Sequence, residues 1–83
     1  MPLIDWDTFD PSKVFDWDFN SECLASGTYN PVTRTLTLEF NQRGTFEYYD
    51  VPVTLVIGLV QSSSAGRYFN ATIRDNFQYT RIG

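Results

Sequence analysis

An alternating run in the middle of the chain constrains the fold most. In residues 35–40 the leucines and the phenylalanine fall at every second position, which is typical of a strand with one buried face. Residues 41–44 read Asn-Gln-Arg-Gly and suit a type I turn, with glycine supplying the left-handed conformation of a three-residue loop with a bulge. Residues 45–49 continue as a return strand, so the sequence predicts an antiparallel β-hairpin.

The turn also predicts how the two strands are paired. A loop of residues 42–44 places Phe40 opposite Phe46, so that apolar side chains meet on one face. The same register places Glu39 directly opposite Glu47 on the other face. Like charges in this arrangement destabilise a sheet slightly unless a cation covers them.

The flanking segments predict one further strand and one or two helices. Residues 24–29 read as a strand that ends at a turn of Asn and Pro. After the hairpin, apolar residues recur with the spacing of a helix. Pro52 suits the first position of that helix, and Asp50, just before it, is a possible cap. The residues with that spacing are Val53, Val56, Ile57 and Val60. A second short helix is expected around Tyr68, Phe69 and Ile73, before a tail that bears Phe77, Tyr79 and Ile82.

We therefore expect an α+β fold: a small antiparallel three-stranded meander packed against one or two short helices, with an extended N-terminal segment. The chain of 83 residues is long enough for one small domain. We divide it into an acidic, aromatic segment, residues 1–20, and a folded domain, residues 21–83.

The negative charge is concentrated near the N-terminus. Residues 1–22 carry six carboxylates against one lysine, whereas the remainder carries five arginines against four carboxylates. Two Asp-Trp-Asp units, each with a phenylalanine one or two residues later, lie in this acidic part. Rigid aromatic anchors ringed by charge are typical of compact protein interfaces. Residues expected to bind a partner are Asp5, Trp6, Asp7, Phe9, Asp16, Trp17, Asp18 and Phe19. Equally, Trp6 and Trp17 could cap the domain's own core.

The residue content argues against catalysis, metal binding and a membrane span. The chain has no histidine and a single cysteine, Cys23, so it lacks an internal disulfide and an imidazole to activate a nucleophile. The paired aspartates lack the glycine and ligand spacing of a calcium loop. The longest apolar stretch, residues 51–60, is about half of what crosses a bilayer. We expect a protein without cofactor or metal, not secreted, in a reducing compartment such as the cytoplasm.

Ordered elements along the chain resemble the KTSC domain. They are Ser21, Leu24, Tyr29-Asn30-Pro31, Leu36 to Phe40, Gly44, Phe46 to Pro52, Gly66-Arg67-Tyr68-Phe69-Asn70, Ile73-Arg74 and Tyr79-Thr80-Arg81-Ile82. That module is named for its occurrence at the C-terminus of some lysyl-tRNA synthetases and also occurs as a stand-alone protein in bacteria and their phages. The resemblance implies no catalytic residues. Phe46 stands where the family usually has tyrosine.

Two functions remain open at this point. The first is a non-enzymatic module that binds another protein, with a larger assembly or a homo-oligomer as partner. Because the family occurs in phages, the resemblance implies that this module could be a component of a phage particle. In that reading, an edge strand could also accept an added strand. The second, ranked lower, is RNA binding, suggested by the resemblance. Its candidate residues are Arg67, Tyr68, Phe69, Arg74, Tyr79 and Arg81. The protein would be cytoplasmic, or located in the virion if a phage encodes it.

Overall fold

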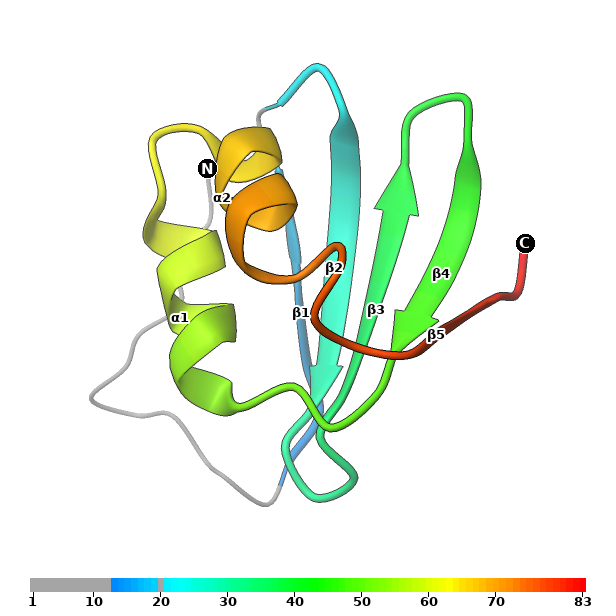
Figure 1. Cartoon of the computed structure of the whole chain (residues 1–83), viewed down its shortest axis with the longest axis vertical. Coiled ribbons are helices and arrows are strands. Elements are labelled where there is room, and N and C mark those ends of the chain that lie inside the picture. The colour runs from blue at the N-terminus through cyan, green and yellow to red at the C-terminus, as the bar shows by residue number, and fades with distance from the viewer. Residues whose placement is uncertain (1–12, 20) are drawn as a thin grey trace.

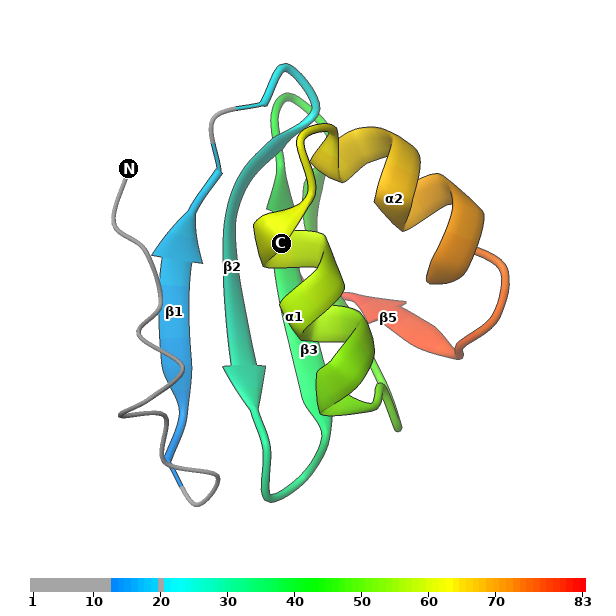
Figure 2. The ribbon, with the colours of Figure 1, turned by 90° about the vertical axis from the view of Figure 1, so that its left-hand side faces the viewer.

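A computed structural model describes residues 13–19 and 21–83. Along these residues the elements are β1 (Phe15–Asp18), β2 (Leu24–Asn30), β3 (Thr35–Phe40), β4 (Gly44–Tyr48), α1 (Val53–Gln61), α2 (Ala65–Thr72) and β5 (Tyr79–Arg81). The strands form one antiparallel sheet in the order β1-β2-β3-β4-β5. Both helices lie between β4 and β5 in the chain and pack on the same side of the sheet (Figure 1, Figure 2).

The α+β class is confirmed, but the expected number of strands is wrong. The sheet has five strands rather than three, because β1 and β5 add to the two edges of the predicted meander. β1 is four residues long and lies in the N-terminal segment that was expected to be extended but not to join the sheet. All three residues of β5 are exposed, so that strand has no alternation of buried and exposed positions to read from the sequence.

The core fills the space between the inner face of the sheet and the two helices. Its fully buried side chains include Leu36 and Leu38, whose alternation in β3 is as predicted. The remaining buried residues are Trp17, Leu24, Tyr29, Tyr48, Val51, Val56, Leu59, Val60, Ala65, Phe69 and Ile73. The two helices are thus where the sequence predicts them, with Val56 and Val60 buried from α1 and Phe69 from α2.

The register of the β3–β4 hairpin differs by two residues from the predicted one. Phe40 pairs with Gly44 and Leu38 with Phe46, so the loop is residues 41–43. Gly44 has the positive φ expected of it, at 105°, but Gln42 also adopts a left-handed conformation, at φ 65°, which was not expected. Because the difference is an even number of residues, each side chain stays on its predicted face.

The predicted opposition of Glu39 and Glu47 is therefore wrong. Glu39 lies opposite Thr45, and Glu47 lies opposite Thr37. The Ser26 hydroxyl donates a hydrogen bond to Glu39 Oε1 at 3.2 Å. The Tyr49 hydroxyl likewise donates to Glu47 Oε1 at 3.2 Å, so no cation is needed to cover the two carboxylates as a pair.

The connection from β4 to α1 also differs from the predicted cap. Helix α1 begins at Val53 with Pro52 as its N-cap, and no side chain caps the helix. Asp50, the expected cap, instead takes a left-handed conformation at φ 57° that turns the chain out of β4. The backbone of Pro52 is extended, at ψ 145°, so this residue lies just before the helix rather than at its first position.

Tyr29 ties this connection to the sheet at Val51. Its hydroxyl is buried and donates to the Val51 carbonyl at 2.6 Å. The Val51 backbone N–H in turn donates to the Arg34 carbonyl at 3.0 Å. The turn after β2 and the approach to α1 are thus held together at one end of the molecule.

Neither described helix has the length and apolar character to span a membrane.

Candidate functional site

A cycle of five aromatic rings lies where α2, β3, β4 and β5 meet. Each ring contacts two others at centroid distances of 5.1 to 5.9 Å, most of them edge to face. In order around the cycle the rings are Phe40, Phe46, Tyr79, Tyr48 and Phe69. Aromatic pairs in this arrangement are favourable beyond the area they bury. The cycle attaches the short strand β5 to the core.

The cycle opens to solvent at Tyr79. Phe69 and Tyr48 are buried, but 56% of Tyr79 is exposed. Arg81 covers the neighbouring ring, with its guanidinium carbon 5.9 Å from the centroid of Phe46. This distance is within the range of a cation–π contact. The surface formed by Tyr79, Arg81 and Phe46 is called the β5 surface below.

Burial raises the pKa of the Tyr48 phenol. The nearby Tyr79 raises it further, and the positive charge of Arg74 partly opposes the shift. Tyr48 is thus a neutral phenol at physiological pH. Arg74 is thus the positive charge that acts on this phenol of the aromatic cycle.

Hydrogen bonds at both ends of β5 show which of its backbone groups face β4. The Tyr49 N–H donates to the Gln78 carbonyl at 3.0 Å, and the Ile82 N–H donates to the Thr45 carbonyl at 2.8 Å. In an antiparallel ladder the bonded pairs recur at every second residue. Thr80, midway between these two pairs, therefore directs its own N–H and carbonyl toward β4.

The neighbours of Thr80 direct their backbone groups the other way. The N–H and carbonyl of Tyr79 and of Arg81 point from the sheet toward its free edge. All three residues of the strand are exposed. The β5 surface therefore combines an aromatic ring, a guanidinium and two outward-facing peptide units, which are the groups that an added strand would use.

The six residues expected to bind RNA do not form one patch. Phe69 is buried, and Tyr68 is half-buried with its hydroxyl directed at Gly58 of α1. Arg67 is exposed on α2, away from its buried face. Only Tyr79 and Arg81 share a surface on one strand, with Arg74 close to the rings behind them.

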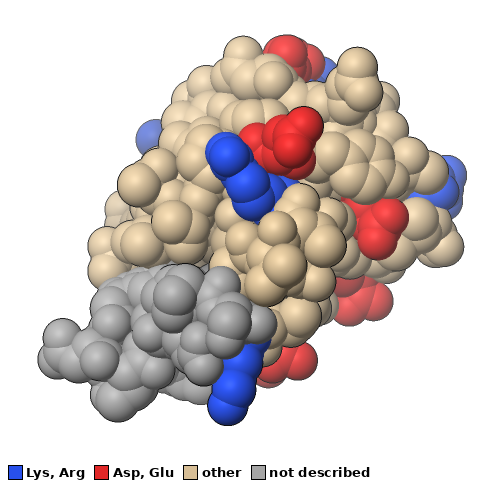
Figure 3. Space-filling view, turned by 90° about the horizontal axis from the view of Figure 1, so that it is seen from below, with Lys and Arg blue, Asp and Glu red and all other residues tan. Residues whose placement is uncertain are grey.

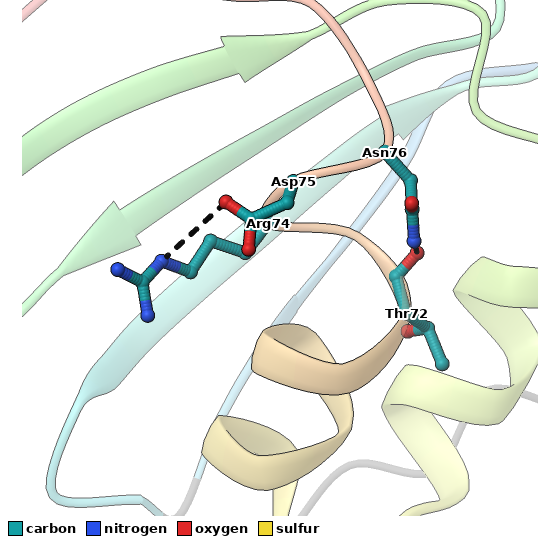
Figure 4. Close-up of polar contacts among 4 residues, drawn as sticks. All are labelled: Thr72, Arg74, Asp75 and Asn76. Carbon is teal, nitrogen blue, oxygen red and sulfur yellow. Dashed lines mark hydrogen bonds and ion pairs between the residues drawn. The ribbon is translucent and has the colours of Figure 1, made fainter.

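Arg74 follows α2 in the connection to β5. Its Nε lies 3.9 Å from Asp75 Oδ1, and both side chains are exposed (Figure 4). The Asn76 side chain donates to the Thr72 carbonyl at 2.8 Å and holds the chain after the helix. The guanidinium is thus positioned near solvent beside a carboxylate.

The tryptophan expected either to bind a partner or to cap the core takes the second role. Only 5% of Trp17 is exposed. Its ring lies against Gly27 of the neighbouring strand and contacts the half-buried Phe19 edge to face at 5.7 Å. Trp17 is therefore not a surface anchor, and Phe19 is only partly available.

The remaining residues expected to bind a partner have different positions. Asp16 and Asp18 are exposed on the outer face of β1. Asp5, Trp6, Asp7 and Phe9 lie outside the described residues. Phe40, Phe46 and Tyr48 were not among the expected site residues, because their contribution depends on strand pairings that join them to Tyr79.

The outer face of the sheet, opposite the helices, is acidic. Residues directly across an antiparallel ladder share a face, so two rows cross the sheet on this side. One row is Asp16, Thr28, Thr37, Glu47 and Thr80; the other is Asp18, Ser26, Glu39 and Thr45. These rows contain four carboxylates and no lysine or arginine, which disfavours a polyanion on this face.

Charges at one end of the molecule are mixed. The view from below in Figure 3 shows acidic and basic side chains interspersed, without a continuous basic patch on the visible described surface. Within the described part of the chain, no three acidic or cysteine side chains gather as a metal site would require. The β5 surface is therefore the place where distinct recognition groups converge.

Comparisons with known proteins agree on one small module. The model of the KTSC domain matches residues 20–77. A KTSC domain protein from Yersinia pestis, known from a crystal structure, superposes with a TM-score of 0.81 at 28% identity, over 86% of this chain and 100% of that one.

Sequence relatives include both large and small proteins. A lysine–tRNA ligase from Nostoc is 41% identical over 54 residues, which are 65% of this chain and 10% of the ligase. This chain thus corresponds to about a tenth of that relative. A protein of Stutzerimonas stutzeri is 33% identical over 63 residues, which are 75% of this chain and 89% of that protein.

Proposed function

The chain belongs to the KTSC family, and on that premise we propose that it is a non-enzymatic binding module whose β5 edge accepts an extended segment of a partner protein. The observation that carries the proposal is the orientation of β5. The backbone N–H and carbonyl groups of Tyr79 and Arg81 face the free edge of the sheet, beside the exposed ring of Tyr79. Main-chain bonds would supply affinity, and the β5 surface would select side chains.

The charge distribution supports a protein partner over a nucleic acid. The net charge is −4, and the outer face of the sheet carries four carboxylates. A polyphosphate approaching β5 would meet this field on one side. An extended peptide needs only the narrow edge, where Arg81 supplies a local positive charge.

RNA binding is the second candidate, and one observation favours it. Tyr79 and Arg81 are adjacent on one exposed surface, with Arg74 near the same rings. An aromatic ring for stacking beside guanidinium groups is a common arrangement for unpaired bases. The relatives that are lysine–tRNA ligases are consistent with a place near RNA.

Three earlier expectations stay predictions. A role in assembling a phage particle, a location in the cytoplasm or a virion, and partner binding by Asp5, Trp6, Asp7 and Phe9 rest on the sequence and the resemblance. The β5 surface is the part of the binding proposal that the described residues support.

Two substitutions at one position test strand addition. Tyr79→Ala removes the ring, whereas Tyr79→Pro removes the ring and also the outward-facing N–H. The full chain, tagged at its N-terminus, is used to capture proteins from the organism that encodes it, and bound proteins are identified by mass spectrometry. We expect a partner that the native chain captures, that Tyr79→Ala captures in a smaller amount, and that Tyr79→Pro does not capture.

The control is Arg34→Ala, on the turn after β2, which should leave capture unchanged. A captured partner that binds the Tyr79→Pro chain as well as the native one would refute binding at β5. RNA would be identified by a mobility shift that falls steeply with salt and is lost with Arg74→Gln and Arg81→Gln.

A further inference from the structure

We infer that the segment added at β5 is β5 of a second copy of this chain, which joins two sheets across a twofold axis at Thr80. This inference rests on the proposed function, because it names the partner of the same edge. Four large hydrophobic side chains are exposed among the described residues, and two of them, Tyr79 and Ile82, lie in or beside β5.

The backbone of β5 is self-complementary. Its outward-facing groups belong to Tyr79 and Arg81, which lie one residue on either side of Thr80. In an antiparallel pair centred on Thr80, Tyr79 of each copy lies opposite Arg81 of the other. Such opposed residues exchange both of their hydrogen bonds. This one register therefore satisfies all four outward N–H and carbonyl groups of each copy.

The side chains are complementary in the same register. Tyr79 and Arg81 are on the inner face of the sheet, because they pair with Tyr48 and Phe46. The twofold axis places the guanidinium of each copy beside the phenol ring of the other. Arg81 already lies over the Phe46 ring at 5.9 Å, so a second ring would extend an existing cation–π contact. No like charges face each other.

The opposite edge of the sheet is unsuited to the same pairing. Phe19 donates its N–H to the Ala25 carbonyl at 3.0 Å, so the odd-numbered residues of β1 bond to β2 and the even-numbered residues face outward. The outward residues are Asp16 and Asp18. A symmetric pairing of two β1 strands that uses both would place aspartate opposite aspartate, which is destabilising. Self-association is therefore specific to β5.

The contact is small and should be weak. A strand of three residues supplies four backbone hydrogen bonds, and two chains of charge −4 repel each other. A dissociation constant on the order of 0.1–1 mM is expected for so short an edge. Salt screens the repulsion between the copies, so the dimer should strengthen as salt increases. Binding to RNA would show the opposite dependence.

Sedimentation equilibrium of the full chain, from 10 µM to about 2 mM, tests the association. We expect the mean mass to rise toward that of a dimer. Tyr79→Ala removes both symmetric cation–π contacts and should weaken the dimer about tenfold. Tyr79→Pro also removes two hydrogen bonds and should leave a monomer throughout. Circular dichroism and thermal unfolding establish that each variant is folded.

Disulfide trapping tests the register without relying on a proline. In a Cys23→Ser background, Thr80→Cys places two thiols across the axis, where the opposed Cα atoms are about 4.5 Å apart and can be bridged. Ile82→Cys is the matched control. Its two copies are four residues apart along the strands, about 13 Å, which is beyond the reach of a disulfide. We expect mild oxidation to cross-link the first variant alone.

A mean mass that stays monomeric up to 2 mM would overturn the inference, as would equal cross-linking at positions 80 and 82. The proposed function fails separately. If the chain is monomeric but Tyr79→Pro abolishes capture of a different protein, strand addition at β5 stands and only its self-pairing is wrong. If neither association nor capture depends on Tyr79, both proposals are wrong.

Discussion

At the scale of single residues, the hydroxyl of Tyr29 makes a contribution to stability that can be measured. Its hydroxyl is buried and bonded to the Val51 carbonyl, and burial raises the pKa of this phenol above 10.0, with Arg34 partly opposing the shift. Removal of the hydroxyl leaves a buried carbonyl without its donor. Tyr29→Phe should therefore lower the free energy of unfolding by about 1–2 kcal/mol at pH 7, measured by urea denaturation.

The same residue predicts a dependence on alkaline pH. Because the folded pKa is raised, the hydrogen bond contributes its full stability below pH 10 and loses it as the pH rises through the folded pKa. Urea denaturation between pH 8 and pH 11 should show this decline, with a smaller decline in Tyr29→Phe. Tyr48 has a raised pKa too, so part of the decline should remain. An unchanged pH profile in Tyr29→Phe would contradict the prediction.

At the scale of elements, the attachment of β1 depends on one glycine. A Cβ atom on Gly27 would lie 2.6 Å from the Trp17 ring, so alanine there forces the indole or the strand to move. Gly27→Ala should destabilise the protein by about 1–3 kcal/mol, as expected for overpacking. The measurement is the urea midpoint, together with the near-ultraviolet signal of the tryptophans.

Gly66→Ala is the matched control for that prediction. It makes the same chemical change in α2, where the nearest atoms, in Cys23, are 3.8 Å away. Alanine should be neutral or stabilising by up to about 1 kcal/mol at that position. Equal destabilisation by both substitutions would contradict the steric explanation for Gly27.

Predictions from the sequence succeed where an element has a clear period. Leu36 and Leu38 in β3, and Val56 and Val60 in α1, are buried as their spacing indicates. The predicted register of the hairpin is wrong because Gln42 takes a positive φ in addition to Gly44, which closes the loop at residues 41–43. Local preferences favour glycine at a positive φ. The positive φ of Gln42 is imposed by the pairing of β3 with β4, which the local sequence does not reveal.

The candidate site was predicted only in part. Tyr79 and Arg81 belong to the set expected from the sequence, but Tyr68 and Phe69 of the same set pack inward. Residues that are adjacent in the sequence can face different surroundings, because successive side chains on a helix point about 100° apart. Trp17 shows the same difficulty, since an aromatic residue ringed by aspartates suits a surface as well as a short edge strand whose alternate residues are buried.

At the scale of the whole molecule, β1 (Phe15–Asp18) is an integral part of the folded domain. Trp17 belongs to the core, and β1 pairs with β2 over four residues. A chain of residues 19–83 loses this strand and a buried indole, and we expect it to be destabilised by roughly 3–5 kcal/mol, or unfolded. Thermal unfolding followed by circular dichroism measures the loss.

A chain of residues 13–83 is the control for that truncation, because it keeps every described strand. We expect it to unfold in one cooperative transition. If residues 19–83 unfold with the same midpoint as residues 13–83, β1 contributes nothing to stability, and its pairing with β2 must be reconsidered.

The order of the sheet has a consequence for how the β5 surface is assembled. Neighbours in the sheet are also neighbours in the chain, and β1 to β4 are connected by short turns. The pairing of β4 with β5 instead encloses both helices, residues 49–78, and has the greatest loop-closure entropy of the four ladders. The edge proposed to accept another chain therefore forms only once both helices are in place, and a nascent chain that has not yet folded its helices does not possess it.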